Sequence, residues 1–197
     1  MKTGNLVLIV VLLFVLIFGG CACGRYNSMV QQDENVTEKW NNVQSDYQRR
    51  ADLIPNLVNT VKGAANFEQE TLTRVIEARA KATSVQINSA EELTPEKLQQ
   101  FQAAQGELNS ALSRLLVTVE QYPELKANQN FLDLQAQLEG TENRIKVSRN
   151  EFNGAVRQYN TTIRQFPNNI FAGMFGFQKR EGFTAEEGAE RAPTVEF

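Results

Sequence analysis

The feature that most constrains the fold of this chain is an apolar residue that recurs every seven positions in its C-terminal half. The repeat consists of Phe131, Leu138, Ile145, Phe152, Tyr159 and Phe166. The positions three residues further on are small more often than large. A seven-residue apolar repeat is typical of a long helix that packs along other helices. The sequence therefore predicts a protein built from helical rods, and a role in contact rather than in catalysis.

The first 25 residues have the pattern of a membrane anchor. No charged residue stands between Lys2 and Arg25, and 22 uncharged residues in a helix would extend about 33 Å, enough to cross a hydrocarbon core. A cleaved signal peptide, which would release the protein, has a similar pattern. Because Cys21 follows two glycines, it is also a candidate for lipidation after cleavage. A spanning helix and a lipid anchor both make the lipid bilayer a partner.

Apolar spacing after the anchor predicts three or four long helices. We expect them over residues 26–84, 94–122 and 124–165. Pro55 should kink the first helix, which leaves open whether it is one helix or two. Thr94 can cap the second helix, with Pro95 at its first position. Because the connections are short, neighbouring rods should be antiparallel. The predicted fold class is all-α, an N-terminal membrane helix followed by an elongated antiparallel bundle.

Three regions follow from this division of the chain. Residues 1–25 form the anchor, residues 26–166 the bundle, and residues 167–197 an apolar and then polar tail. The tail has aromatic residues without helical or strand period, including Phe171, Phe175 and Phe177. These rings either plug one end of the bundle or dock on a membrane or a partner, because such a patch is costly to leave in water.

The composition argues against several classes of function. The chain has no histidine, which is the commonest general base and the commonest transition-metal ligand. Its two cysteines, Cys21 and Cys23, both stand at the membrane edge, so no disulfide framework is expected in the bundle. The net charge of −3 predicts no nucleic-acid surface. We expect neither catalytic residues, nor a metal, nor a cofactor, and we do not expect an enzyme.

The densest polar stretch on the first predicted helix is the candidate for contact with a protein partner. Its residues are Arg49, Arg50, Asp52, Pro55 and Asn56. Because Arg49 and Arg50 point about 100° apart on a helix, only one of them can face a neighbouring rod. A buried arginine paired with a carboxylate would fix the register of the rods. A pair of solvated arginines is the equal alternative.

Several segments resemble the LemA family. The longest is Tyr47–Val58, which reads Tyr-Gln-Arg-Arg-Ala-Asp-Leu-Ile-Pro-Asn-Leu-Val and is similar to the central motif of that family. Further similar segments are Tyr26–Val30, Asp33–Asn35, Trp40, Glu77–Ala82, Tyr122–Ala127, Glu142–Ile145 and Tyr159–Asn160. These segments are spread from residue 26 to residue 160, and the resemblance extends over nearly all of the chain after residue 25.

The resemblance implies a bacterial protein with one N-terminal membrane helix, an all-helical domain and no established molecular function. Members of the family are often described with the helical domain in the cytoplasm. In this chain, Lys2 and the amino terminus instead favour a helical domain outside the cytoplasm. We expect a single-pass protein of the bacterial cell membrane, the inner one if there are two. Its predicted function is a self-assembling scaffold or adaptor with an unknown protein partner. The alternative is an envelope lipoprotein that binds a ligand or modulates an enzyme.

Overall fold

The computed structural model describes residues 3–63, 67–87 and 92–184, although within residues 3–21 it describes only a few side chains. These residues form helices and connecting segments, with no strand among them. The helices are α1 (Thr3–Lys62), α2 (Gln69–Ser84), α3 (Pro95–Val119), α4 (Pro123–Lys126), α5 (Gln129–Arg164) and α6 (Asn168–Phe175). The predicted all-α class is confirmed.

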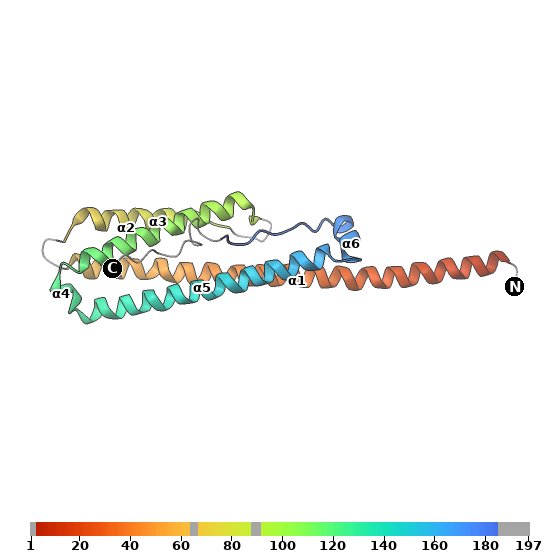
Figure 1. Ribbon diagram of the computed structural model, residues 1–197, viewed down its shortest axis with the longest axis horizontal. Coiled ribbons are helices and arrows are strands. Elements are labelled where there is room, and N and C mark those ends of the chain that lie inside the picture. The colour runs from red at the N-terminus through yellow and green to blue at the C-terminus, as the bar shows by residue number, and fades with distance from the viewer. Residues whose placement is uncertain (1–2, 64–66, 88–91, 185–197) are drawn as a thin grey trace, which may run out of the picture.

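The described helices form an elongated antiparallel bundle around the C-terminal half of α1 (Figure 1). α5 lies along α1 for most of its length, and α2 and α3 pack on each other over the end of α1. The N-terminal part of α1, which precedes Ala22, projects beyond the bundle. The short helix α6 lies at the end from which α1 emerges, and the chain after it runs back along the bundle.

The predicted helix over residues 26–84 is two helices, and the break does not fall at its proline. α1 continues through Pro55 to Lys62, and α2 begins at Gln69. At its other end, α1 extends back to Thr3, so the backbone is helical from the predicted anchor into the bundle without interruption. The predicted anchor and the bundle therefore share one helix.

Side-chain caps set two of the other helix starts. Thr94 caps α3 as predicted, because its Oγ1 accepts a hydrogen bond from the Lys97 N–H at 3.3 Å and Pro95 occupies the first turn. The predicted helix over residues 124–165 is divided into α4 and α5. Asn128 causes the restart, since its Oδ1 accepts from the Phe131 N–H at 3.3 Å.

The seven-residue repeat of α5 forms the core as predicted, except at its last member. Its first five side chains are buried, whereas Phe166 lies beyond the end of α5 and is 81% exposed. Trp40 of α1 is also buried. The core consists of two apolar clusters, one nearer α6 and one nearer α4. Between them lie the buried polar residues Arg50, Gln105 and Thr141.

The predicted membrane-spanning helix is not confirmed. Within the residues that the structure describes, no helix is both long enough and apolar enough to cross a membrane. Most side chains of the apolar stretch lie outside those residues, so the anchor at residues 1–25 stays a prediction.

Candidate functional site

A single buried guanidinium joins three helices at the boundary between the two apolar clusters. Arg50 of α1 is 2% exposed. Its Nη1 donates to Glu142 Oε1 of α5 at 2.6 Å, and its Nη2 donates to Gln105 Oε1 of α3 at 2.5 Å. Gln105 Nε2 in turn donates to the Ala82 carbonyl of α2 at 3.3 Å. The polar layer of Arg50, Gln105 and Glu142 thus connects all four long helices.

The surroundings of Arg50 are partly aromatic and partly open. Its guanidinium carbon lies 5.0 Å from the centre of the Tyr47 ring, a cation–π distance. Burial raises the pKa of the Tyr47 hydroxyl, against the lowering effect of the charges on Arg149 and Arg50. The Arg50 Nε is buried and has no hydrogen-bond partner among the described residues. A groove of about 460 Å³ runs beside it, with Tyr47, Glu142 and Arg149 among its walls.

Pro55 and Arg79 form a second junction, one turn further along α1. A proline has no N–H, so Pro55 cannot donate to the carbonyl of Ala51 four residues before it. The Arg79 Nε of α2 donates to that carbonyl at 2.7 Å. The donor missing from α1 is therefore supplied by α2, and the proline positions an arginine contact between the two helices.

Asparagine side chains hold the extended segment of residues 177–184 against α5. Asn160 Nδ2 donates to the Arg180 carbonyl at 2.8 Å, and the Arg180 N–H donates to Asn160 Oδ1 at 3.0 Å. Asn153 makes the same pair with Phe183, at 3.1 and 2.8 Å. Seven helical residues rise about 10.5 Å and three extended residues about 10 Å, so the two spacings match. The paired amides replace the hydrogen bonds that a neighbouring strand would offer.

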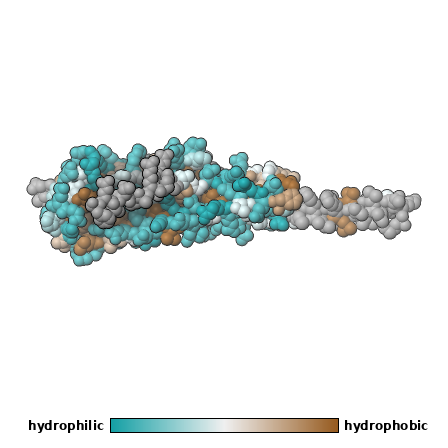
Figure 2. Space-filling model, in the orientation of Figure 1, coloured by the Kyte–Doolittle hydropathy of each residue, from teal (hydrophilic) through white to brown (hydrophobic). Residues whose placement is uncertain are grey.

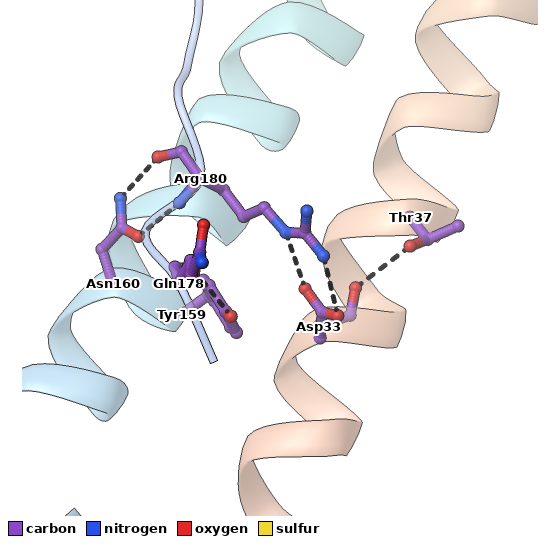
Figure 3. Close-up of polar contacts among 6 residues, drawn as sticks. All are labelled: Asp33, Thr37, Tyr159, Asn160, Gln178 and Arg180. Atoms are coloured by element: carbon purple, nitrogen blue, oxygen red, sulfur yellow. Dashed lines mark hydrogen bonds and ion pairs between the residues drawn. The ribbon is translucent and has the colours of Figure 1, made fainter. Parts of the chain in front are cut away.

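An ion pair ties the same segment to α1 (Figure 3). The Arg180 guanidinium meets both carboxylate oxygens of Asp33, with Nε–Oδ1 at 3.0 Å and Nη2–Oδ2 at 3.1 Å. Beside it, the Tyr159 hydroxyl donates to the Gln178 carbonyl at 2.9 Å. Further along, the Phe183 ring packs among Trp40 and Phe152 in the core. The segment is therefore part of the bundle.

Comparison with known proteins confirms the resemblance to the LemA family. A family model described as the LemA family matches residues 39–197. The chain belongs to the LemA family. It is 28% identical over 204 aligned residues to Magnetosome protein MamQ 1 of Paramagnetospirillum magneticum, covering 95% of this chain and 75% of that protein. It is 30% identical over 175 residues to Magnetosome protein MamQ of Magnetospirillum gryphiswaldense, covering 81% and 64%. It is 25% identical over 181 residues to Protein LemA of Metamycoplasma hominis, covering 90% and 78%.

In this LemA-family chain the longest family-like segment, Tyr47–Val58, carries both junctions. Arg50 supplies the centre of the polar layer, and Pro55 leaves the carbonyl that Arg79 binds. Arg79 itself belongs to the similar segment Glu77–Ala82. The motif has a structural explanation in this chain, because its residues take part in contacts of α1 with α2, α3 and α5.

The predicted contact residues on α1 lie on two different sides of the helix. Arg49, Asp52, Pro55 and Asn56 are exposed, and Asp52 accepts a hydrogen bond from Gln48 at 2.8 Å. Arg50 is buried in the polar layer, so it belongs to the register-fixing alternative and does not contribute to an outer surface. Contact between the exposed residues and a partner stays a prediction.

The aromatic residues of the tail also divide into two groups. Phe171 is buried, and Phe177 is partly buried against the apolar cluster nearer α6, so both rings help to close that end of the bundle. Phe175 is 46% exposed, beside the exposed Ile170 and Met174. The buried rings therefore fit the alternative in which the tail closes the end of the bundle. The exposed Phe175 fits the alternative in which the tail docks on a membrane or a partner.

The chemistry predicted for the membrane edge falls mostly outside the described side chains. The side chain of Cys21 is not among them, whereas Cys23 is an exposed free thiol. Within the described residues, no group of three or more cysteine, aspartate or glutamate side chains could hold a metal ion. The polar layer, the proline junction and the asparagine pairs were not predicted as such, because each joins residues at least 20 positions apart.

Proposed function

We propose that this chain is a membrane-anchored scaffold that presents a rigid helical surface close to the bilayer. The observation that carries the proposal is the continuity of α1, a 60-residue helix that leads from the apolar stretch into the centre of the bundle. A helix of that length extends about 90 Å. The C-terminal half of α1 lines both apolar clusters. The bundle is therefore fixed to the helix that continues into the anchor, and the two would keep one relative orientation.

The location proposed is the bacterial cell membrane, with residues 1–25 as a single-pass anchor. The absence of charge between Lys2 and Arg25 supports it. The relatives named as magnetosome proteins and as LemA are consistent with a protein associated with membranes. The intact mass of the chain extracted from its own membrane tests the anchor. An unmodified full chain supports a spanning helix, and a chain that begins at an acylated Cys21 replaces it with a lipid anchor.

The surface proposed for contact is the outer face of α1, where Arg49, Asp52 and Asn56 are exposed at helical spacing. A scaffold of this kind would present that face to a second copy or to a partner protein. The polar layer and the Arg79 contact support its rigidity, since they fasten the opposite side of the same turns to α2, α3 and α5.

Self-assembly is tested by the mass of the full chain in lipid nanodiscs and by cross-linking in membranes. We expect more than one copy per complex, and a shift toward single copies when Arg49→Glu and Asn56→Glu are combined. Arg114→Glu on the exposed side of α3 is the matched control and should change nothing. A single copy of the wild-type chain would exclude self-assembly, and an unchanged double variant would exclude this face.

The groove beside Arg50 supports a second candidate function, the binding of a small anionic ligand by an envelope lipoprotein. The supporting observation is the buried Arg50 Nε without a partner among the described residues, with Arg149 also on the wall of the groove. Native mass spectrometry of the extracted chain tests it. A retained small molecule that is lost in Arg149→Ala supports this function, and its absence from both proteins excludes it.

A further inference from the structure

We propose that the outward face of α6 lies on the surface of the bilayer that holds the anchor. The partner of this face is the lipid itself. The apolar side chains of α6 would contact the acyl chains, and the basic side chains around them would contact anionic headgroups. This inference rests on the proposed function, because it requires the chain to be anchored through its N-terminal stretch. It adds a second membrane contact, at a place in the chain nearly 150 residues after the first.

The outward face is apolar although it meets solvent. Ile170 and Met174 of α6 stand at four-residue spacing and are 52% and 65% exposed, and Phe175 beside them is 46% exposed. Phe166, in the turn just before the helix, is 81% exposed. The inner face of the same helix buries Phe171 and Ala172 in the bundle. A helix that is apolar on both faces is typical of one that is covered on both sides. Exposed apolar patches mark contact with a protein or a membrane.

The position of α6 selects the membrane as its partner. Tyr26 of α1 packs edge-on against Phe175 and Phe177, with ring centres 5.0 and 5.7 Å apart. Tyr26 directly follows Arg25, where the uncharged stretch ends. The helix α6 therefore lies beside the point at which α1 leaves the bundle (Figure 1). Figure 2 shows hydrophobic surface gathered at this same end of the bundle.

The distribution of charge favours the same orientation. No aspartate or glutamate occurs in residues 1–32 or 152–180, although the chain as a whole has a net charge of −3. Basic side chains do occur in these ranges, and Arg25, Arg164 and Lys179 are exposed. Cationic side chains next to a bilayer are attracted by anionic headgroups. At the end of the bundle near α6, these two segments thus combine apolar side chains with basic ones and contain no carboxylate.

Quenching of tryptophan fluorescence by brominated lipid tests the proposal on the full chain. The chain has one tryptophan, Trp40, which is buried and lies about 23 Å along α1 from Arg25. The probes are Met174→Trp and, as a second site on the same face, Ile170→Trp. The matched control is Val117→Trp. Val117 is exposed near the C-terminal end of α3, at the end of the bundle away from α6. Each protein is reconstituted into vesicles of phosphatidylcholine and phosphatidylglycerol, with and without bromine on the acyl chains.

Flotation of the vesicles separates the failure of the anchor from the failure of this contact. We expect all proteins to float with the vesicles, and brominated lipid to reduce the emission of the two α6 probes but not of the control or the wild type. Flotation without quenching at either α6 probe overturns the contact and leaves the anchor intact. Emission that shifts with protein concentration but is insensitive to bromine assigns the face to a second copy and also overturns it. A chain that does not float overturns both proposals.

Discussion

Arg50 is the residue on which the arrangement of the four long helices depends most. Its buried charge has one carboxylate partner, Glu142, and one amide partner, Gln105. A buried charge is costly to desolvate, so any arrangement that leaves this group or its partners unpaired is unfavourable. This explains why a core that could have been continuous is interrupted by a polar layer between its two apolar clusters.

Replacing Arg50 by methionine should therefore destabilise the bundle. The change removes two charge-assisted hydrogen bonds and leaves the buried Gln105 oxygen without its donor, a loss of about 2–4 kcal/mol. Thermal unfolding of the full chain in detergent, followed by circular dichroism, measures it. Arg49→Met is the matched control, and because Arg49 is exposed it should change stability by less than about 0.5 kcal/mol. Equal unfolding temperatures in the two variants would refute the structural role.

Tyr47 gives the core a dependence on pH at the alkaline end. Burial raises the pKa of its hydroxyl above the ordinary value of 10.0. Above pH 10 the unfolded chain ionises this group while the folded chain still holds the proton, so stability falls as the pH rises. The stability that the protonated Tyr47 hydroxyl contributes is fully present below pH 10 and is lost as the pH rises through its pKa in the folded chain. Between about pH 9 and pH 11, Tyr47→Phe should lose less stability than the wild type, as measured by urea unfolding. Some loss should remain in both proteins, because the pKa of Tyr159 is also raised and this residue titrates in both. Parallel losses would contradict this assignment.

At the scale of helices, the coupling between α1 and α2 is open to a direct test. Arg79 binds the Ala51 carbonyl that Pro55 leaves without a donor. In Pro55→Ala the new backbone N–H can bind this carbonyl, so the loss of Arg79 should matter less. We expect Arg79→Met to cost about 1–2 kcal/mol in the wild-type chain and clearly less in the Pro55→Ala chain, a coupling that a double-mutant cycle measures. Strictly additive effects would show that the proline and the arginine act independently.

The extended segment after α6 depends on a glycine. A Cβ on Gly182 would stand 2.7 Å from Asn153 Oδ1, the atom that accepts from the Phe183 N–H. Gly182→Ala should therefore loosen residues 178–184 and speed hydrogen exchange at the Arg180 and Phe183 amides. Gly140→Ala in α5 is the control, because no atom lies within 4 Å of the added Cβ. It should stabilise the helix by about 0.5–1 kcal/mol. Unchanged exchange in Gly182→Ala would show that the asparagine pair tolerates a side chain.

What the sequence could predict at this scale is whatever is encoded locally. The repeat of α5 and the Thr94 cap depend on residues within a few turns, and the structure confirms both. The continuation of α1 through Pro55 depends on an arginine 24 residues later, and the binding of residues 177–184 depends on asparagines on another element. Such contacts leave no periodic pattern. The pair Asn153 and Asn160, seven residues apart beside the apolar repeat, was the one available signal.

For the whole molecule, α1 joins a bundle that begins near Ala22 to an N-terminal part that projects beyond it. Among the side chains that the structure describes, Met29 is the first buried core residue of α1 and Ala22 the earliest that packs against the core. Removing residues 1–21 should therefore leave the unfolding temperature within about 2 °C, less than about 1 kcal/mol for a chain of this size. The same truncation should abolish flotation with vesicles, because the contact of α6 alone buries too little apolar surface to hold the bundle there. Calorimetry of the shortened and full chains, with flotation as the second measurement, checks both parts. A large fall in unfolding temperature would mean that the first 21 residues stabilise the bundle, and persistent flotation would mean that the bundle holds the membrane without them.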